Sequence, residues 1–286
     1  MSKIKYFFQF AGIILLFGIF KLLGRKYASI FSGIIMMMIG PFFRSKKICH
    51  INLSTAFPEL EIKQKENILK EMWFNYGRIL AEYVFISNFR NSKLFNNIII
   101  ENQIELEKIK NSSEPVIFVS GHFNNFELMA MHLEKSGINL AALYRPLNNP
   151  FLNPLMEKIR KKYICKKQVK KGISGTKELL RYFKNGSSVA LMIDQRVSEG
   201  IKCNFFNKQA FTTTIPAQFA KKYNAKIVPI YIERTKNNNF KIKIYQSLEF
   251  SKNETLEKIT LELNRILENM IKKNPSQWIW THNRWK

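Results

Sequence analysis

The sequence predicts an α/β domain with a mixed, largely parallel sheet flanked by helices, preceded by an apolar N-terminal segment. Short runs of β-forming residues alternate with helix-like segments through the second half of the chain, an alternation typical of strands joined by crossover helices. Two uncharged apolar runs lie within the first 43 residues. The chain has 286 residues, of which 46% are hydrophobic, enough for one substantial domain with accessory segments.

Residues 1–43 are expected to form a hydrophobic membrane anchor. The two apolar runs, Tyr6–Phe20 and Tyr27–Phe43, are bounded by basic residues and are short for a bilayer span, which needs about 20 residues. The first run therefore either spans the membrane or lies in its interface, and no small-x-small signal-peptide cleavage site follows it. The second is expected to be interfacial or packed against the domain. The basic flanks favour the cytoplasmic side.

The remaining residues, 44–286, are expected to form one domain. Apolar residues recur with helical spacing over 61–89, which predicts a long helix there. Strands are expected at 98–101, 116–119, 140–144, 189–193, 227–232 and 240–245. Helices are expected at 126–135, 154–162, 175–184, 215–223 and 255–272. A turn at Asn237-Asn238-Asn239 indicates that the last two strands form a hairpin.

Polar residues follow three of the expected strands. In chain order they are Gly121-His122, Arg145, and Asp194-Gln195. In open α/β sheets, ligands bind beyond the carboxyl ends of the strands, so parallel strands would bring a base, a cation and a carboxylate to one edge. The alternative is that Arg145 and Asp194 simply form an ion pair at the rim of the sheet.

The segment around His122 indicates a strand, a turn and a helix. His122 and Glu127 can meet only if His122 lies in the turn and Glu127 in the first helical turn, with Asn124 or Asn125 as the N-cap. A carboxylate on one imidazole nitrogen fixes the tautomer and leaves the other nitrogen as a base. The alternative is a histidine that caps the helix and a glutamate favoured by the helix dipole.

The composition limits the partners of this chain. Lys and Arg outnumber Asp and Glu by 46 to 21, a net charge of +25, which favours polyanions such as nucleic acid, anionic membrane or an acidic protein. No zinc finger, helix-turn-helix or RNP-like aromatic pair is recognisable, so nucleic acid is not expected. The three cysteines are far apart and the four histidines lack metal-ligand spacing, so no disulfide, metal or cofactor is expected.

Several ordered motifs resemble one known family, the bacterial lipid A late acyltransferases, which transfer lauroyl and myristoyl groups in lipopolysaccharide assembly. The motifs are Asn52–Pro58, Asn75–Arg78 with Glu82, Gly121–Glu127, Tyr144–Pro146 with Asn149-Pro150, Asp194-Gln195, Phe205-Phe206 with Ala210 and Thr212, Pro216-Ala217, and Pro275–Lys286 with its three tryptophans. The resemblance covers most of the chain. One departure is that the family usually has glycine where Asn124 or Asn125 stands.

The resemblance implies a glycerolipid-acyltransferase-like fold and an acyltransferase of groups other than aminoacyl groups. The fatty acyl group would pass from acyl carrier protein, or from coenzyme A, to a hydroxyl of a lipid A precursor, at the cytoplasmic side of the bacterial inner membrane. His122 would be the base and Glu127 its orienter. Substrate-binding roles are implied for Arg145, Asp194, Asn125 and Gln195. Arg145 suits a phosphate, and Asp194 would orient Arg145 or a sugar hydroxyl.

Two other functions remain open at this point. The acceptor could be another glycolipid or a phospholipid. A different class of function is a non-catalytic basic protein that binds membrane or nucleic acid, although that does not account for the apolar N-terminus. No Gly-x-Ser-x-Gly nucleophile motif is present in the sequence, which favours direct attack by the acceptor over an acyl-enzyme.

Overall fold

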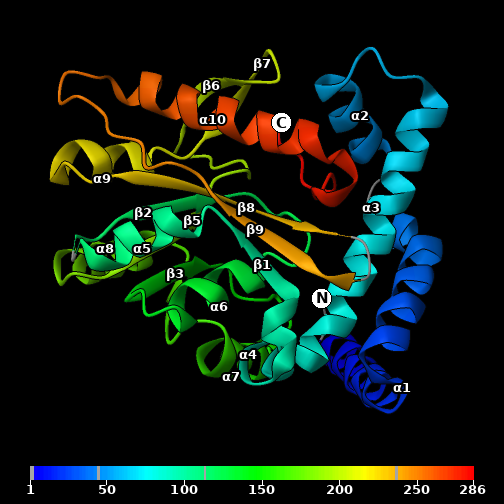
Figure 1. The fold of residues 1–286 in the computed structure, drawn as a ribbon. Helices are drawn as coiled ribbons and strands as arrows, with labels where there is room; N and C mark the ends of the chain where they lie inside the picture. The colour runs from blue at the N-terminus through cyan, green and yellow to red at the C-terminus, as the bar shows by residue number, and fades with distance from the viewer. Residues whose placement is uncertain (1–2, 44–45, 113, 236–237) are drawn as a thin grey trace.

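A seven-stranded sheet forms the centre of the fold, with strand order β1-β9-β8-β2-β5-β3-β4 (Figure 1). The computed structural model describes residues 3–43, 46–112, 114–235 and 238–286. Every neighbouring pair of strands in this sheet is parallel except β8 and β9, which are antiparallel. The expected mixed, largely parallel sheet is therefore confirmed.

The strands lie close to their expected positions. The sheet contains β1 (Ile98–Glu101), β2 (Ile117–Ser120), β3 (Leu140–Tyr144), β4 (Lys167–Lys170), β5 (Ser188–Met192), β8 (Ile227–Arg234) and β9 (Phe240–Ile244). A separate hairpin contains β6 (Ile201–Phe205) and β7 (Lys208–Thr212). The expected β8–β9 hairpin is confirmed, although Asn237 of its turn lies outside the described residues. The sequence analysis missed β4, whose short Lys-Gln-Val-Lys run is mostly polar, and the β6–β7 hairpin.

The helices cover both faces of the sheet. They are α1 (Lys3–Phe43), α2 (Lys46–Ala56), α3 (Ile62–Glu82), α4 (Ile86–Asn91), α5 (Gln103–Asn111), α6 (Glu127–Lys135), α7 (Leu152–Tyr163), α8 (Ile173–Lys184), α9 (Ile215–Tyr223) and α10 (Leu256–Lys273), with 3-10 turns η1 (Tyr83–Phe85), η2 (Lys93–Asn97) and η4 (Pro275–Gln277). Figure 1 shows α9 and α10 above the sheet and α6 and α7 below it. The helix expected over 61–89 is interrupted by η1.

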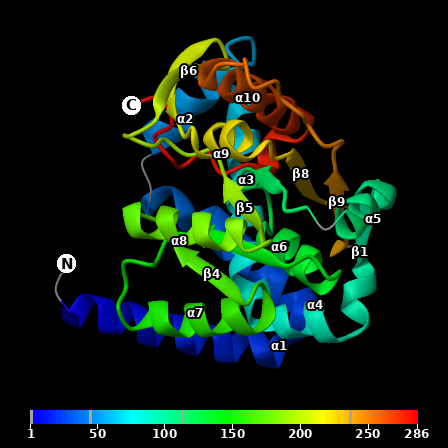
Figure 2. The same cartoon turned by 90° about the vertical axis from the view of Figure 1, so that its left-hand side faces the viewer.

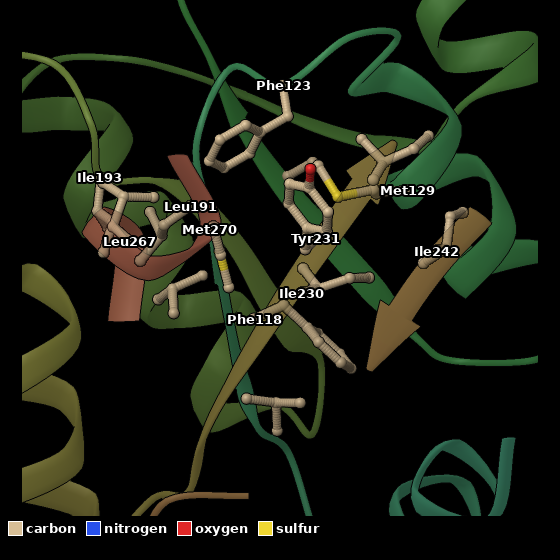
Figure 3. Packing of buried hydrophobic residues seen from close by; sticks show 14 of the residues in the cluster. Phe118, Phe123, Met129, Leu191, Ile193, Ile230, Tyr231, Ile242, Leu267 and Met270 are labelled. Carbon is tan, nitrogen blue, oxygen red and sulfur yellow. The ribbon is translucent and has the colours of Figure 1, made fainter. Parts of the chain in front are cut away.

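The apolar core fills the space between the sheet and the helices on its two faces. All four residues of β2 are buried, as expected for a parallel strand covered on both sides. Figure 3 shows Phe118 of β2 and Ile230 of β8 among side chains from α6, α10 and the end of β5. Burying each such large apolar side chain contributes about 1.5–3 kcal/mol relative to exposure. This packing fixes the strand ends that carry the polar residues.

The N-terminal helix α1 is kinked at Gly24, where φ is 70° and ψ is 162°. The part before the kink runs along the bottom of the molecule beneath α7 (Figure 2). The Phe7 ring lies edge-on to Phe151 with 5.8 Å between centroids, and Asn149 Nδ2 donates to the Tyr6 carbonyl oxygen at 2.8 Å. Other apolar side chains remain open to solvent, including Phe8 at 69% and Leu22 at 89% exposure.

The part of α1 after the kink packs along α3. Ser32 Oγ donates to the Gly77 carbonyl oxygen at 2.6 Å, and a Cβ at Gly77 would lie 2.2 Å from the Ser32 carbonyl oxygen. Glycine is therefore needed at position 77 for this close approach. Of the two expectations for residues 27–43, packing against the domain is the one observed. By length and composition, Lys3–Phe42 is apolar enough to cross a membrane.

Candidate active site

His122 and Asp194 meet at the carboxyl edge of the sheet. They follow β2 and β5, which are neighbouring parallel strands, so the chain leaves both strands at the same edge. His122 Nδ1 lies 2.7 Å from Asp194 Oδ1, and the His122 main-chain N donates to Asp194 Oδ2 at 2.8 Å. Asp194 is only 3% exposed. A carboxylate bonded at Nδ1 leaves Nε2 as the basic atom of the ring.

Burial and charge act in opposite directions on this pair. Burial lowers the pKa of His122, but the charge and hydrogen bond of Asp194 raise it by more, so the pKa lies above its ordinary value. Burial likewise raises the pKa of Asp194, but His122 and the N–H donors around the carboxylate lower it to about 2. Asp194 is therefore ionised and can only accept, which assigns the Nδ1 proton to His122.

The expected hydrogen bond between Glu127 and His122 is wrong. His122 lies in the loop and α6 begins at Glu127, as predicted, but the Glu127 carboxylate is bonded elsewhere. Its Oε1 accepts from Arg160 Nε at 2.8 Å and Nη2 at 2.6 Å, and from the Tyr83 hydroxyl. The carboxylate bonded to His122 instead comes from Asp194. Asp194 is distant in the chain, but it follows β5, which is the neighbour of the strand that precedes His122. The N-cap of α6 is Phe126, not Asn124 or Asn125.

Arg160 is the partner of Glu127, a contact that sequence reasoning missed because Arg160 stands in the basic run Arg160-Lys161-Lys162 near the end of α7. Its guanidinium is mostly buried against Glu127 and lies over the Tyr144 ring at 5.5 Å. Burial lowers the pKa of Arg160, but Glu127 and Tyr83 together raise it by more, and the net pKa is raised. Arg160 Nη1 is buried without a hydrogen-bond partner among the described residues. It is therefore a buried donor whose hydrogen-bonding capacity the described residues leave unused.

The residues predicted to bind substrate after β3 and β5 differ in burial and do not all contact one another. Arg145 follows β3 and is exposed, and no described residue pairs with it. The expected contact between Arg145 and Asp194 is wrong, because the Asp194 oxygens bond to His122 and to Trp278 Nε1, the latter at 2.9 Å. Gln195 is half-buried beside Asp194. The sequence analysis also missed Trp278, although it noted the aromatic C-terminal motif.

Asn125 belongs to a buried polar network behind the His122 loop. Arg234 binds Glu82 through two nitrogens, Nη1 to Oε1 at 2.6 Å and Nη2 to Oε2 at 3.0 Å. Arg234 Nη2 also donates to Asn124 Oδ1 at 2.9 Å, and Asn125 Nδ2 donates to Glu82 Oε2 at 3.0 Å. Ser29 of α1 donates to Glu82 Oε1 at 3.3 Å. The network fixes the loop that presents His122.

Comparison with known proteins identifies similar proteins along the whole chain. The family model described as bacterial lipid A biosynthesis acyltransferase matches residues 1–286. A lipid A biosynthesis acyltransferase of Haemophilus influenzae is 25% identical over 248 residues, covering 85% of this chain and 78% of the relative. The lauroyltransferase of lipid A biosynthesis in Escherichia coli K12 is 24% identical over 254 residues, covering 85% and 79%. The corresponding myristoyltransferase is 22% identical over 243 residues, covering 82% and 73%.

Among solved structures, a 1-acyl-sn-glycerophosphate acyltransferase from Thermotoga maritima aligns with a TM-score of 0.41 and 14% sequence identity, covering 90% of this chain and 100% of that one.

Proposed function

Because the chain belongs to the bacterial lipid A biosynthesis acyltransferase family, we propose that it moves a fatty acyl group from acyl carrier protein, or from coenzyme A, to a hydroxyl of a lipid A precursor. The enzyme is an acyltransferase of groups other than aminoacyl groups. The observation that carries the proposal is the buried Asp194 carboxylate on His122 Nδ1, because acyl transfer to an alcohol needs a base that accepts the hydroxyl proton.

His122 acts as the general base in this proposal. Its Nε2 takes the proton of the acceptor hydroxyl while the hydroxyl oxygen attacks the thioester carbonyl carbon. The tetrahedral intermediate then collapses, the carbon–sulfur bond breaks, and the departing thiolate receives the proton from His122. Asp194 stabilises the imidazolium between these two steps. Among the described residues no protein group is hydrogen-bonded to Nε2, which leaves this atom for the acceptor.

Glu127 is proposed to act through Arg160. Its carboxylate holds the Arg160 guanidinium beside the site, so that Nη1 can donate to an oxygen of the bound substrates. Arg145, exposed at the same edge of the sheet, is proposed to bind a substrate phosphate through its planar fork. Gln195 is proposed to contact the acceptor, and Asn125 to support substrate binding by holding the loop.

Residues 1–43 are proposed to attach the enzyme to the cytoplasmic face of the inner membrane, with 44–286 as the acyltransferase domain. The support is the exposed apolar surface of α1, which includes Leu15 at 68% and Leu22 at 89% exposure. The net charge of +25 favours anionic lipid headgroups and an acidic carrier protein. An acceptor lipid in the membrane would then lie close to the catalytic domain.

Lipid A mass spectrometry in a deletion strain tests the proposal. Loss of the gene should remove one acyl chain from lipid A, and the wild-type gene should restore it, whereas His122→Ala should not. His50→Ala removes an imidazole from α2 and serves as the matched control, because no described residue is hydrogen-bonded to that ring. Unchanged lipid A in the deletion strain, together with acylation of a phospholipid by the purified enzyme, would contradict the proposed acceptor.

A further inference from the structure

We infer that Trp278 is a positioning residue of the reaction, whose indole N–H fixes the Asp194 carboxylate and thereby the orientation and proton affinity of His122. The inference rests on the proposed function, in which neutral His122 is the base. It assigns to a residue of the C-terminal segment a role that is exerted through Asp194.

Three N–H groups converge on the Asp194 carboxylate. His122 Nδ1 lies 2.7 Å from Oδ1, and Oδ2 accepts from the His122 main-chain N at 2.8 Å and from Trp278 Nε1 at 2.9 Å. Two of these groups belong to His122 itself. Trp278 is therefore the only donor among the described residues that holds the carboxylate independently of the residue it orients.

The direction of the Trp278 N–H is fixed by packing. The side chain is buried, and its ring meets Trp280 at 89° with 4.6 Å between centroids. The backbone of Trp278 forms an antiparallel bridge with Phe123, the residue after His122. A planar ring held on several sides has little rotational freedom, so the indole N–H is aimed before substrate binds.

The segment around Trp278 braces the two strand ends that carry His122 and Asp194. The Asn124 main-chain N donates to the Gln277 carbonyl oxygen at 2.8 Å, on the His122 side. His282 Nε2 accepts from the Arg196 main-chain N at 2.9 Å, on the Asp194 side. The C-terminal segment thus connects both halves of the pair, and Trp278 lies between these two connections.

Removing the indole N–H should raise the proton affinity of His122. With one donor fewer, more of the negative charge on Asp194 is available to the imidazolium, which favours the charged ring. The other charged or titratable groups that act on the pair are Glu127 of α6, Lys171 after β4, and His282 and Arg284 of the C-terminal segment. None of these groups is altered by replacing a tryptophan with phenylalanine.

The test compares Trp278→Phe with Trp285→Phe in the full-length enzyme in detergent. Trp285 also stands in the C-terminal segment, but its indole N–H donates to the Phe205 carbonyl oxygen at 3.0 Å and its ring packs on Phe205 and Phe206, so it is the matched control. For Trp278→Phe we expect the acid limb of the kcat/KM profile to move upward by about one pH unit, with roughly tenfold loss of rate below it. Trp285→Phe should leave the limb in place. An unmoved or lowered limb in Trp278→Phe would overturn the inference.

A measurement on the unaltered protein covers the case in which Trp278→Phe does not fold. The chain contains four tryptophans, and their ¹⁵N-labelled indole N–H resonances can be followed by NMR against pH. The Trp278 resonance should titrate with the pKa of His122 and lose that titration in His122→Ala, while the Trp285 resonance should not respond. A Trp278 resonance indifferent to His122 in an active enzyme would overturn the inference. A protein that shows the titration but no acyl transfer would contradict the proposed function instead.

Discussion

His122 Nδ1 and Asp194 Oδ1 are 2.7 Å apart although 72 positions separate the two residues in the chain. The contact exists because β2 and β5 are parallel neighbours. It also requires a residue without a side chain at position 121, since a Cβ there would lie 3.3 Å from Asp194 Oδ2 and 2.9 Å from the Phe123 ring. Gly121 therefore permits the carboxylate and the loop to approach closely. The pair at the candidate site can therefore form only in a sheet in which β2 and β5 are neighbours.

Replacing Asp194 by asparagine should lower kcat by roughly 10²–10⁴-fold, the range associated with loss of general-base catalysis. The amide places an NH₂ group against N–H donors and removes the charge that stabilises imidazolium. Because Asp194 raises the pKa of His122, the remaining activity should have its acid limb at lower pH than the wild type. Steady-state kinetics over a pH series would measure both effects, with Glu262→Gln, on the solvent-facing side of α10, as the control. A wild-type rate in Asp194→Asn would show that another group holds His122.

The sequence was sufficient to predict the elements that contain strong local patterns. The bounds of β1, β3 and α9 agree with those expected, because short apolar runs flanked by polar residues and amphipathic spacing specify such segments locally. The prediction that His122 and Asp194 follow strands at one edge also came from these patterns. The order β2-β5 within the sheet depends on long-range packing, which local patterns do not contain. Sequence patterns alone therefore favour Glu127, which is near in the chain, as the partner of His122.

Two residues of the candidate site could not be recognised from local patterns. Trp278 bonds to Asp194 across 84 positions, and its aromatic neighbours are equally typical of a core cluster. Arg160 bonds to Glu127 across 33 positions and stands among lysines that resemble a solvated charged face. Both contacts depend on which helix or segment packs beside the edge of the sheet. The spacing of residues within a segment does not predict that packing.

Acid should destabilise the fold before it protonates Asp194. Burial lowers the pKa of His132 to about 4, and its ring stacks on Phe95 with 4.9 Å between centroids. A histidine whose pKa is lowered in the folded state contributes stability that is present above its unfolded pKa and is lost as pH falls toward 4. The loss should reach about 3 kcal/mol. Denaturant unfolding at pH 7 and pH 4 would measure it, and His132→Phe should flatten the dependence. An equally steep dependence in His132→Phe would assign the effect to other groups.

Breaking the buried Glu82–Arg234 pair should be costly. Glu82→Gln or Arg234→Met alone should destabilise the domain by about 3–5 kcal/mol, because each leaves a buried charge without its partner. The double variant should cost less than the sum, since both charges are then gone. A double-mutant cycle by denaturant unfolding would test this, with the exposed Glu254–Lys258 pair as a control worth about 0.3–0.5 kcal/mol. Additive effects for Glu82 and Arg234 would contradict the coupling seen in the structure.

The two halves of α1 should differ in what their removal does. Deleting residues 1–23, before the kink at Gly24, should weaken vesicle binding. The deletion removes the buried Phe20, but the domain should stay folded because Ser29 and Ser32, which are buried in the part of α1 that packs along α3, remain. Deleting residues 1–43 should also lower the unfolding temperature. Any remaining binding to anionic vesicles should fall as salt rises. Flotation and thermal unfolding would separate these effects. Unchanged vesicle binding by the shorter deletion would place the membrane contact elsewhere.

Arg145 should affect substrate affinity rather than turnover. It is exposed and no described residue pairs with it, so its planar fork is free to hold a phosphate with two parallel hydrogen bonds. Lysine keeps the charge but loses the fork, so Arg145→Lys should raise KM for the phosphate-bearing substrate severalfold while kcat stays close to the wild type. Arg265→Lys, at an exposed position of α10, is the control. Kinetics with each substrate varied in turn would identify the one whose KM changes. If kcat falls instead, Arg145 stabilises charge that develops during transfer, and if neither parameter moves, the phosphate binds elsewhere.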